Sequence, residues 1–218
     1  FDIEPAYKGK SIRIQGVIHQ RLLWKSTQSD KPNHAFLIQN LSRHSDQNPA
    51  TSDGLFVYTG KESVPRMNGT EDYVPTVGDW VQIQGLVGHR YGQTELSKPR
   101  LVRVLRRAFD VTKILPRIDL DSRIQDEMPH SMRVFESLEG MHVILKSGAV
   151  AQSGRKIVGQ GQDALFWVIP AEHKVTRRNQ AYHNRVFRDA HPLDDLPDQR
   201  FDNGNGFRIL LGSLGIKG

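Results

Sequence analysis

The sequence of 218 residues contains no cysteine, and this absence excludes disulfide bonds, zinc fingers and thiol-based catalysis. It assigns no compartment, because cysteine-free proteins occur in both oxidising and reducing locations. No run approaches the ~18 consecutive apolar residues of a membrane span, so we expect none. The first residues, Phe1–Pro5, lack an initiator Met and the basic-then-apolar layout of a signal peptide, so we expect a mature or excised piece of a longer chain.

Patterns for catalysis and for tight metal binding are also scarce. No nucleophile, base and orienting group can be assembled from sequence neighbours, which favours a non-catalytic module, although folding can bring distant residues together. His183 and His191, taken with Asp189, Asp194 and Asp195, stand at a spacing that matches no closed metal site, so scattered surface residues are the favoured interpretation. Gly159-Gln160-Gly161 lacks the third glycine and the following helix of a phosphate loop, and it predicts a hairpin turn.

One group of oxygen-bearing residues is a candidate for calcium. Asp46, Asn48 and Asp53 lie close in sequence, and their side chains carry the oxygen ligands that calcium takes. The run lacks the full alternating oxygen pattern and the closing Glu of a helix-loop-helix site, so a turn-rich loop is favoured and calcium stays the alternative. We expect no other cofactor in this chain.

Charge is present in moderate excess and is unevenly distributed. The chain has 30 Lys and Arg against 24 Asp and Glu, a net charge of +6. Residues 1–108 hold 15 basic and 10 acidic side chains, whereas residues 109–218 hold 15 and 14. A charge of this size is what solubility alone favours, and it also suits a polyanionic partner, so both interpretations stay open.

The first half is rich in short alternating segments separated by turns. Gly16 interrupts the first segment where a long strand must bend, and Glu62–Asp72 is expected to be a loop or a poor helix between the third and fourth strands. Five short strands, a bent first strand and a crossing segment predict an all-β (mainly β) fold with an oligonucleotide-binding (OB-type) five-stranded barrel. The expected strands are residues 11–18, 34–39, 55–59, 81–87 and 94–105.

The third of these strands organises the first half. Gly54 and Gly60 bracket five residues rich in aromatic and β-branched types, a composition typical of a short strand between two turns. Strict alternation places Leu55, Val57 and Thr59 on one face and the two aromatics, Phe56 and Tyr58, on the other. One face has to build the core, so the other is available either to stack bases or to pack under a loop.

A family resemblance is carried by Asn48-Pro49-Ala50-Thr51-Ser52-Asp53-Gly54-Leu55-Phe56-Val57-Tyr58-Thr59-Gly60 and by Val77-Gly78-Asp79-Trp80-Val81-Gln82-Ile83-Gln84-Gly85, with weaker likeness at Glu136–Val143 and Asp202–Ile209. These segments resemble the region upstream of the catalytic domain in large secreted bacterial nucleases of the endonuclease/exonuclease/phosphatase superfamily. The resemblance implies a bacterial protein that is secreted or periplasmic, with the catalytic domain of its parent chain as a partner.

The chemistry of that superfamily does not come with the resemblance. Its catalytic domain needs an acidic metal ligand, an Asp-Asn pair after a strand and a Ser-Asp-His run, which position a phosphodiester around a divalent ion. The nearest matches here, Ser52-Asp53-Gly54 and Asp202-Asn203-Gly204, stand in turn contexts. The resemblance therefore implies an accessory region, and a divalent metal is expected only in the missing catalytic domain.

The second half opens with a proline-containing passage, residues 114–129, that predicts a boundary. We expect a barrel over residues 1–108, a linker over 109–130 and a second, smaller β-rich unit over 131–218, with a partial repeat of the barrel as one interpretation. Glu172–Arg200 is polar and predicts a long surface loop. The expected strands of the second unit are residues 141–145, 149–151, 164–169 and 207–211.

Aromatic and basic residues of the first barrel are the candidate binding site. They would stack bases and contact phosphates without base-specific hydrogen bonds, although a small barrel also needs one or two such rings to fill its core. The candidates on the first three strands are Arg21, Trp24, Lys25, Phe36, Phe56 and Tyr58, and those of the last hairpin are His89, Arg90 and Tyr91.

Three functions from different classes remain open on the sequence. The favoured one is a non-catalytic module that binds single- or double-stranded nucleic acid and presents it to the catalytic domain of a secreted nuclease or phosphodiesterase. The second is a structural spacer without a ligand. The third is a complete hydrolase of unrecognised type.

Overall fold

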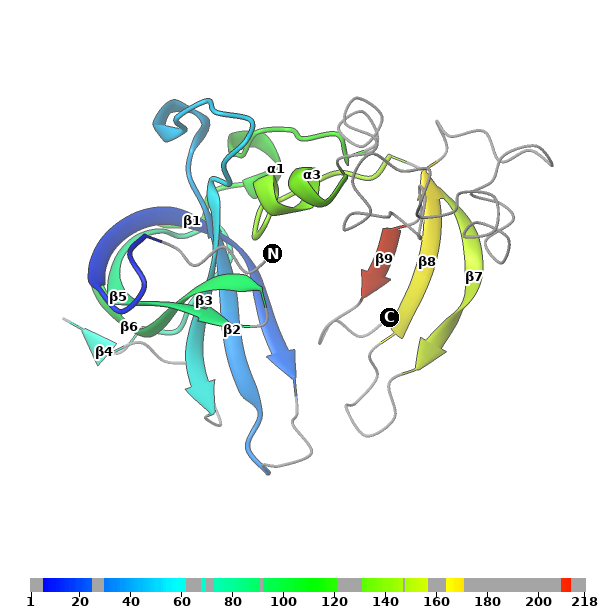
Figure 1. Ribbon diagram of the computed structural model, residues 1–218. Helices are drawn as coiled ribbons and strands as arrows, with labels where there is room; N and C mark the ends of the chain where they lie inside the picture. The colour runs from blue at the N-terminus through cyan, green and yellow to red at the C-terminus, as the bar shows by residue number, and fades with distance from the viewer. Residues whose placement is uncertain are drawn as a thin grey trace. The chain divides into compact units, whose positions relative to one another are not determined.

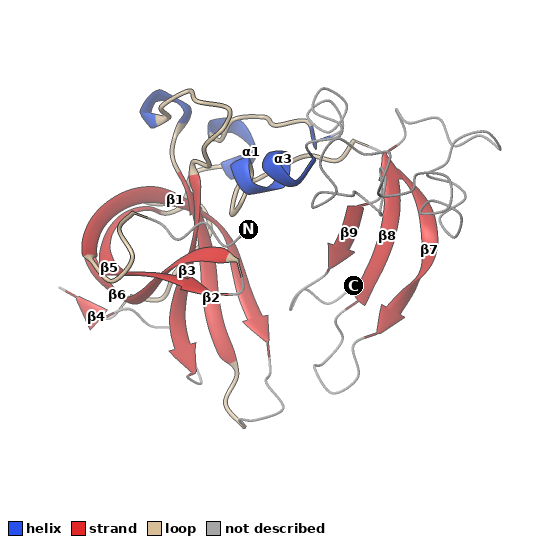
Figure 2. Cartoon of the chain, viewed as in Figure 1, coloured by secondary structure: helices blue, strands red, loops and turns tan. Residues whose placement is uncertain are grey.

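The computed structural model describes residues 6–24, 30–61, 68–69, 73–90, 92–120, 131–146, 148–156, 164–170 and 209–212. Strands predominate in these ranges, which confirms the predicted mainly β class (Figures 1 and 2). The chain divides into two compact units. Unit 1 comprises residues 1–117, 137–142 and 159–161, and unit 2 comprises residues 118–136, 143–158 and 162–218. No helix within the described ranges is long and apolar enough to cross a membrane.

Unit 1 is a strongly curled sheet in which five strands form a closed ring. Antiparallel pairs join β1 to β2, β2 to β3, β1 to β5 and β5 to β6, and the parallel pair of β3 with β6 closes the ring. All five strands were expected from the sequence. The strands are β1 (Ser11–Trp24), β2 (Asn33–Gln39), β3 (Gly54–Lys61), β5 (Trp80–Arg90) and β6 (Gln93–Arg106), and the two-residue β4 (Asn68–Gly69) pairs with β6.

The core of unit 1 fills the inside of this ring with one face of every strand. On β5, for example, Val81 and Ile83 are fully buried, whereas Gln82 and Gln84, each following one of them, face outward, the alternation that a half-buried strand requires. The buried cluster consists of Ile18, Phe36, Ile38, Val57, Tyr73, Val81, Ile83, Val87, Leu96 and Leu101.

The first strand, β1, is long because it pairs with two different strands of the ring. It pairs with β5 over Ser11–Val17 and with β2 over Val17–Trp24, so it changes partner next to Gly16, where the sequence predicted a bend. A Cβ on Gly16 would lie 3.2 Å from the carbonyl oxygen of Gln39, which explains why a small residue occupies this crossing. A bulge follows between Ile18 and Gln20 and leaves His19 outside the regular register.

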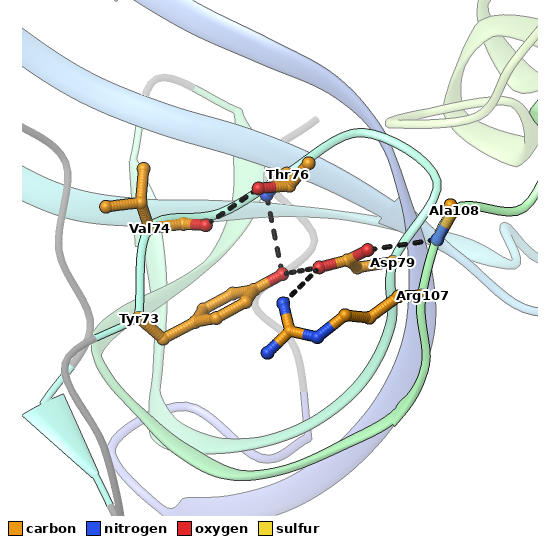
Figure 3. A network of polar contacts seen from close by, with 6 residues as sticks. All are labelled: Tyr73, Val74, Thr76, Asp79, Arg107 and Ala108. Atoms are coloured by element: carbon orange, nitrogen blue, oxygen red, sulfur yellow. Dashed lines mark hydrogen bonds and ion pairs between the residues drawn. The ribbon is translucent and has the colours of Figure 1, made fainter.

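A buried carboxylate ties the start of β5 to the segment after β6 (Figure 3). The Tyr73 hydroxyl donates to Asp79 Oδ2 at 2.7 Å, the Arg107 guanidinium lies 3.4 Å from the same oxygen, and the Ala108 amide donates to Asp79 Oδ1 at 3.2 Å. Burial, followed by the Asp79 hydrogen bond, raises the pKa of Tyr73 far above its ordinary value, so this phenol stays protonated and remains a donor.

Unit 1 extends beyond residue 108, the boundary expected from the sequence. The short helix α1 (Val111–Ile114) follows β6, and Phe109, Val111, Ile114 and Leu115 pack with Trp80 and Val17 on the outside of the ring. Asp110 caps this helix through a 3.1 Å hydrogen bond from the Thr112 amide. Residues 109–115 lie in the segment 109–130 that the sequence predicted to be a linker, and their apolar side chains cover the outer side of the sheet at Val17 and Trp80.

Unit 1 also takes in Ser137–His142 from far along the chain. The Ser52 hydroxyl donates to the carbonyl of Glu139, the His142 amide donates to Gln39 Oε1 at 2.7 Å, and His19 Nε2 donates to the carbonyl of Gly140 at 2.8 Å. Gly54 contacts the Gly140 backbone so closely that no Cβ would fit. The bulged His19 is therefore turned toward this segment and holds it.

Unit 2 contains a three-stranded antiparallel sheet in the order β7-β8-β9, formed by β7 (Gly148–Lys156), β8 (Ala164–Pro170) and β9 (Ile209–Gly212). These strands were expected, but residues 141–145 form none: only Ile144 makes an isolated bridge, with Asp119. The sequence did not predict α3 (Ser131–Ser137). The predicted turn at Gly159–Gly161 and loop at Glu172–Arg200 lie outside the described residues.

Candidate nucleic-acid interface

Three aromatic rings from two strands come together on the outside of the ring of strands. The ring centroid of Trp24, at the end of β1, lies 6.3 Å from that of Phe56 and 6.3 Å from that of Tyr58, both on β3. All three side chains are partly exposed, whereas Val57 between the two β3 aromatics is fully buried. This confirms the alternation predicted for β3. We call Trp24, Phe56 and Tyr58 the aromatic patch.

The strand register explains why these rings meet. Tyr58 pairs with Ala35 on β2, and Ala35 pairs with Leu22 on β1, so the small alanine leaves room above β2 between two larger neighbours. Trp24 lies two residues beyond Leu22 on the same strand face and reaches across β2 to β3. The patch thus depends on one small residue in the middle strand.

Tyr58 is held in a fixed orientation. Its hydroxyl donates to Asn33 Oδ1 at 2.9 Å. Burial raises the pKa of Tyr58, Arg90 acts in the opposite direction, and Glu95 adds to the rise. The phenol is therefore neutral near pH 7, and its ring is oriented before any ligand arrives.

One cation and one anion lie beside the aromatic patch. Arg90 ends β5 and is exposed, and it is near enough to Tyr58 to influence its ionisation. Glu95 on β6 pairs with Phe56 in the parallel β3–β6 register, so the two side chains share a face. The local field is therefore mixed rather than uniformly positive.

The other predicted site residues separate into four groups. Phe36 is a correction: it is 1% exposed and packs in the core, because its position on β2 puts it beside Val57 on the inward face. Arg21 is exposed but pairs with Phe36, on the opposite face of β1 from Trp24. His89 shares the strand face of the buried Val87 and is partly buried. Lys25 and Tyr91 lie outside the described residues.

A second surface of unit 1 was not found from the sequence. Arg13 on β1 and Arg100, Arg103 and Arg106 on β6 are all exposed, and the register places them on the outer face of β1, β5 and β6. One row runs Arg13, Gln84, Arg100, and the next runs Gln15, Gln82, Arg103. Neither row contains an acidic residue. We call the four arginines the arginine face.

Bulges in β6 create this surface. Arg100, Arg103 and Arg106 recur every three residues, and in a regular strand the middle one would point to the opposite side. They pair instead with Gln84, Gln82 and Trp80, which recur every two residues, because the register shifts in each interval. The sequence signal for this face was three arginines spaced three residues apart in a segment predicted to pair with a regularly alternating strand, a spacing that bulges would bring onto one face.

Two stacked arginines mark the end of this face next to α1. The Arg43 guanidinium lies 5.3 Å from the ring centroid of Trp80, and that of Arg106 lies 4.4 Å from the ring centroid of Phe109. Trp80 and Phe109 are neighbours, with centroids 6.5 Å apart. Arg43 belongs to the short 3-10 helix η1 (Ser42–His44), which thereby adds a fifth cation next to the arginine face.

The side chains considered for calcium make hydrogen bonds within their loop. Asp46 accepts hydrogen bonds from the Asn48 amide at 2.9 Å and from the Thr51 hydroxyl at 3.0 Å, and Asp53 accepts one from the Asn40 side chain at 3.2 Å. Such bonds are typical of Asx turns. Across the described part of the chain, no group of three or more His, Asp or Glu side chains is arranged to hold a metal ion.

Comparisons with known proteins leave these two surfaces to be judged on their geometry. The sequence matches no protein-family model, and none of the curated proteins matches it.

Proposed function

We propose that unit 1 binds single-stranded nucleic acid across the aromatic patch, with Arg90 contacting a phosphate. The observation that carries the proposal is the meeting of Trp24, Phe56 and Tyr58 on the outer face of the ring, where each keeps part of its surface exposed. Stacking of a base on such a ring contributes ~1–3 kcal/mol, and it tolerates any base because every base has a π face.

The five-strand ring supports the same proposal by analogy. Five-stranded OB-type barrels bind oligonucleotides on the face of their second and third strands, and two rings of the aromatic patch stand on β3. The fixed Tyr58 orientation lowers the entropy lost on binding. The expected ligand is a short stretch of unpaired bases, bound without strong sequence preference.

The proposal extends to a role in a larger protein. As an accessory module, unit 1 would present polynucleotide to the catalytic domain of a secreted or periplasmic nuclease, and that domain would supply the divalent metal and the chemistry. The support for this extension is the resemblance of Asn48–Gly60, and Gly54 within that segment is where Gly140 makes its close contact.

Fluorescence anisotropy of a labelled single-stranded oligonucleotide, titrated with the full chain at three salt concentrations, tests the proposal. Tyr58→Ala should weaken binding by ~1–3 kcal/mol and leave the salt dependence unchanged, since stacking releases no counterions. Arg90→Gln should lower the slope of log affinity against log salt by ~0.7. Tyr7→Ala removes a ring that is 59% exposed and lies outside the aromatic patch, so it serves as the control.

A second candidate function rests on the same contacts. The rings of the aromatic patch pack on one another and Trp24 extends from Leu22 across the alanine of β2, an arrangement that would also stabilise a spacer without any ligand. Absence of oligonucleotide binding at ~50 mM salt, where attraction to phosphates is least screened, would favour the spacer.

A further inference from the structure

We propose that the arginine face of unit 1 is a second binding site, which takes the phosphate backbone of a double-stranded nucleic acid. The site is separate from the aromatic patch, because it occupies the outer face of β1, β5 and β6 and includes none of the patch residues. It therefore stands or falls independently of single-strand binding.

The arginines of this face are not neutralised by neighbouring side chains. None of the ion pairs formed within the described ranges includes one of them. Arg107, the residue next to Arg106, forms an ion pair with Asp79 and so differs from the four arginines of the face. In the first cross-strand row the neutral Gln84 lies between Arg13 and Arg100, and in the second row the neighbours of Arg103 are glutamines. The positive charge is thus directed to solvent.

This arrangement has a cost in the absence of a ligand. Arg13 and Arg100 are separated by one intervening strand, ~10 Å at the usual strand spacing. Arg100 and Arg103 lie opposite Gln84 and Gln82, which are two residues or ~7 Å apart along β5. Like charges at such distances repel modestly in water and more strongly at low salt. A polyanion lying across the rows would remove this repulsion and would release its own counterions.

Three features favour a duplex over a single strand as the occupant. The rows of Arg13, Arg100 and Arg103 contain no aromatic ring on which an unpaired base could stack. The rings at the end of the face, Trp80 and Phe109, are already contacted by Arg43 and Arg106. A surface that contacts only phosphates gains most from the polymer with the highest charge density, and a duplex carries one charge per ~1.7 Å of its axis.

The decisive experiment measures duplex binding by the full chain as a function of salt. In the double variant R100Q/R103Q, glutamine keeps a polar, exposed side chain of the kind already present in the rows. It should lower the slope of log affinity against log salt by ~1.8, about 0.9 for each lost phosphate contact. R13Q alone, on a different strand, should lower the slope by ~0.9.

The matched control is K31Q/K61Q, which removes the same charge from two exposed positions outside the arginine face, Lys61 at the end of β3 and Lys31 just before β2. It should leave the duplex slope within error of wild type. Y58A should also leave the slope unchanged, which separates this site from the aromatic patch. Circular dichroism and thermal midpoints establish that each variant is folded, and R13Q provides the readout if the double variant is not.

Two results would overturn the proposal. One is an equal fall in slope for R100Q/R103Q and K31Q/K61Q, which would mean that only net charge matters. The other is an equal loss of binding by R100Q/R103Q to heparin, or to phosphatidylserine vesicles, at the same salt, which would make the face a general polyanion surface rather than a duplex site.

Discussion

The two outer faces of unit 1 share β1 but differ in almost every physical respect. The aromatic patch consists of partly buried rings that touch one another, one of them fixed by a hydrogen bond to Asn33. The arginine face consists of exposed, separated cations with neutral side chains between them. Binding to the first would rest mainly on preorganised stacking, whereas binding to the second would rest on salt-dependent attraction to phosphates.

The difference shows how one curled sheet can present two kinds of surface. β1 changes partner at Val17, so its first half contributes Arg13 to one face and its last residue contributes Trp24 to the other. The aromatic rings and the row of arginines thereby stand on different strand pairs. A variant can weaken one without touching the other, and the predictions below use that separation.

The largest effect is expected from breaking the support of the arginine face. Asp79→Ala removes a 2% exposed carboxylate and leaves the Tyr73 hydroxyl and the Ala108 amide without their acceptor. Each donor left without an acceptor in a buried site costs ~1–3 kcal/mol, and urea unfolding followed by circular dichroism would measure the sum. Asp79 precedes Trp80, where the last row of the arginine face begins, so duplex binding should suffer before single-strand binding.

Arg107→Gln is the control for this prediction. Its side chain is 59% exposed and 3.4 Å from Asp79, so its removal should cost at most ~1 kcal/mol. A cost for Arg107→Gln as large as that for Asp79→Ala would show that the ion pair, and not the hydrogen bonds to Tyr73 and Ala108, holds the end of β6.

An intermediate effect is expected at His19, the bulged residue of β1 that lies between the two faces. His19→Leu removes the donor to the Gly140 carbonyl and should cost ~1–2 kcal/mol. Burial lowers the pKa of His19, with the Gly140 hydrogen bond opposing this and the neighbouring His142 adding to it. The native state therefore holds neutral imidazole.

The sign of the pH dependence follows. Because the folded pKa lies below the ordinary 6.5, the stability linked to His19 is complete above pH 6.5 and is lost as the pH falls through the folded pKa. Urea midpoints should fall between pH 7.5 and pH 5 in the wild type and fall less in His19→Leu. An unchanged pH profile in the variant would assign the acid sensitivity to other groups.

The sequence was sufficient wherever the alternation is regular. Val81 and Ile83 against Gln82 and Gln84 predicted β5, and Val57 between two aromatics predicted which face of β3 carries the rings. Regular alternation fails at bulges, because one extra residue reverses the direction of every side chain that follows. The arginine face and the role of His19 were missed for this one reason.

Long-range docking was the other source of error. The sequence assigned 109–130 to a linker and 141–145 to a strand. Neither assignment could include the packing of these segments on the outer surface of the ring of strands. Val17 and Trp80 are apolar side chains on the outer surface, and α1 covers them. The segment Ser137–His142 is held by a hydrogen bond from its backbone to Gln39 and by close backbone contact with Gly54. Only the assembled ring reveals these contacts. Phe36 was predicted to lie on the binding face but is in the core, because strand propensity does not indicate which face of a strand is buried.

The smallest effect is expected at Glu95, an acidic residue on the outer surface beside the aromatic patch. Glu95 pairs with Phe56 and is the acidic neighbour of the aromatic patch, whereas the corresponding positions of the arginine face hold only Gln and Arg. Glu95→Gln should strengthen single-strand binding by ~0.5 kcal/mol, because one partly exposed charge no longer repels the phosphates. The gain should shrink as salt is raised, and duplex binding should not change. If duplex binding improves by as much as single-strand binding, both ligands sense the same field, and the two faces act as one electrostatic surface rather than as two sites.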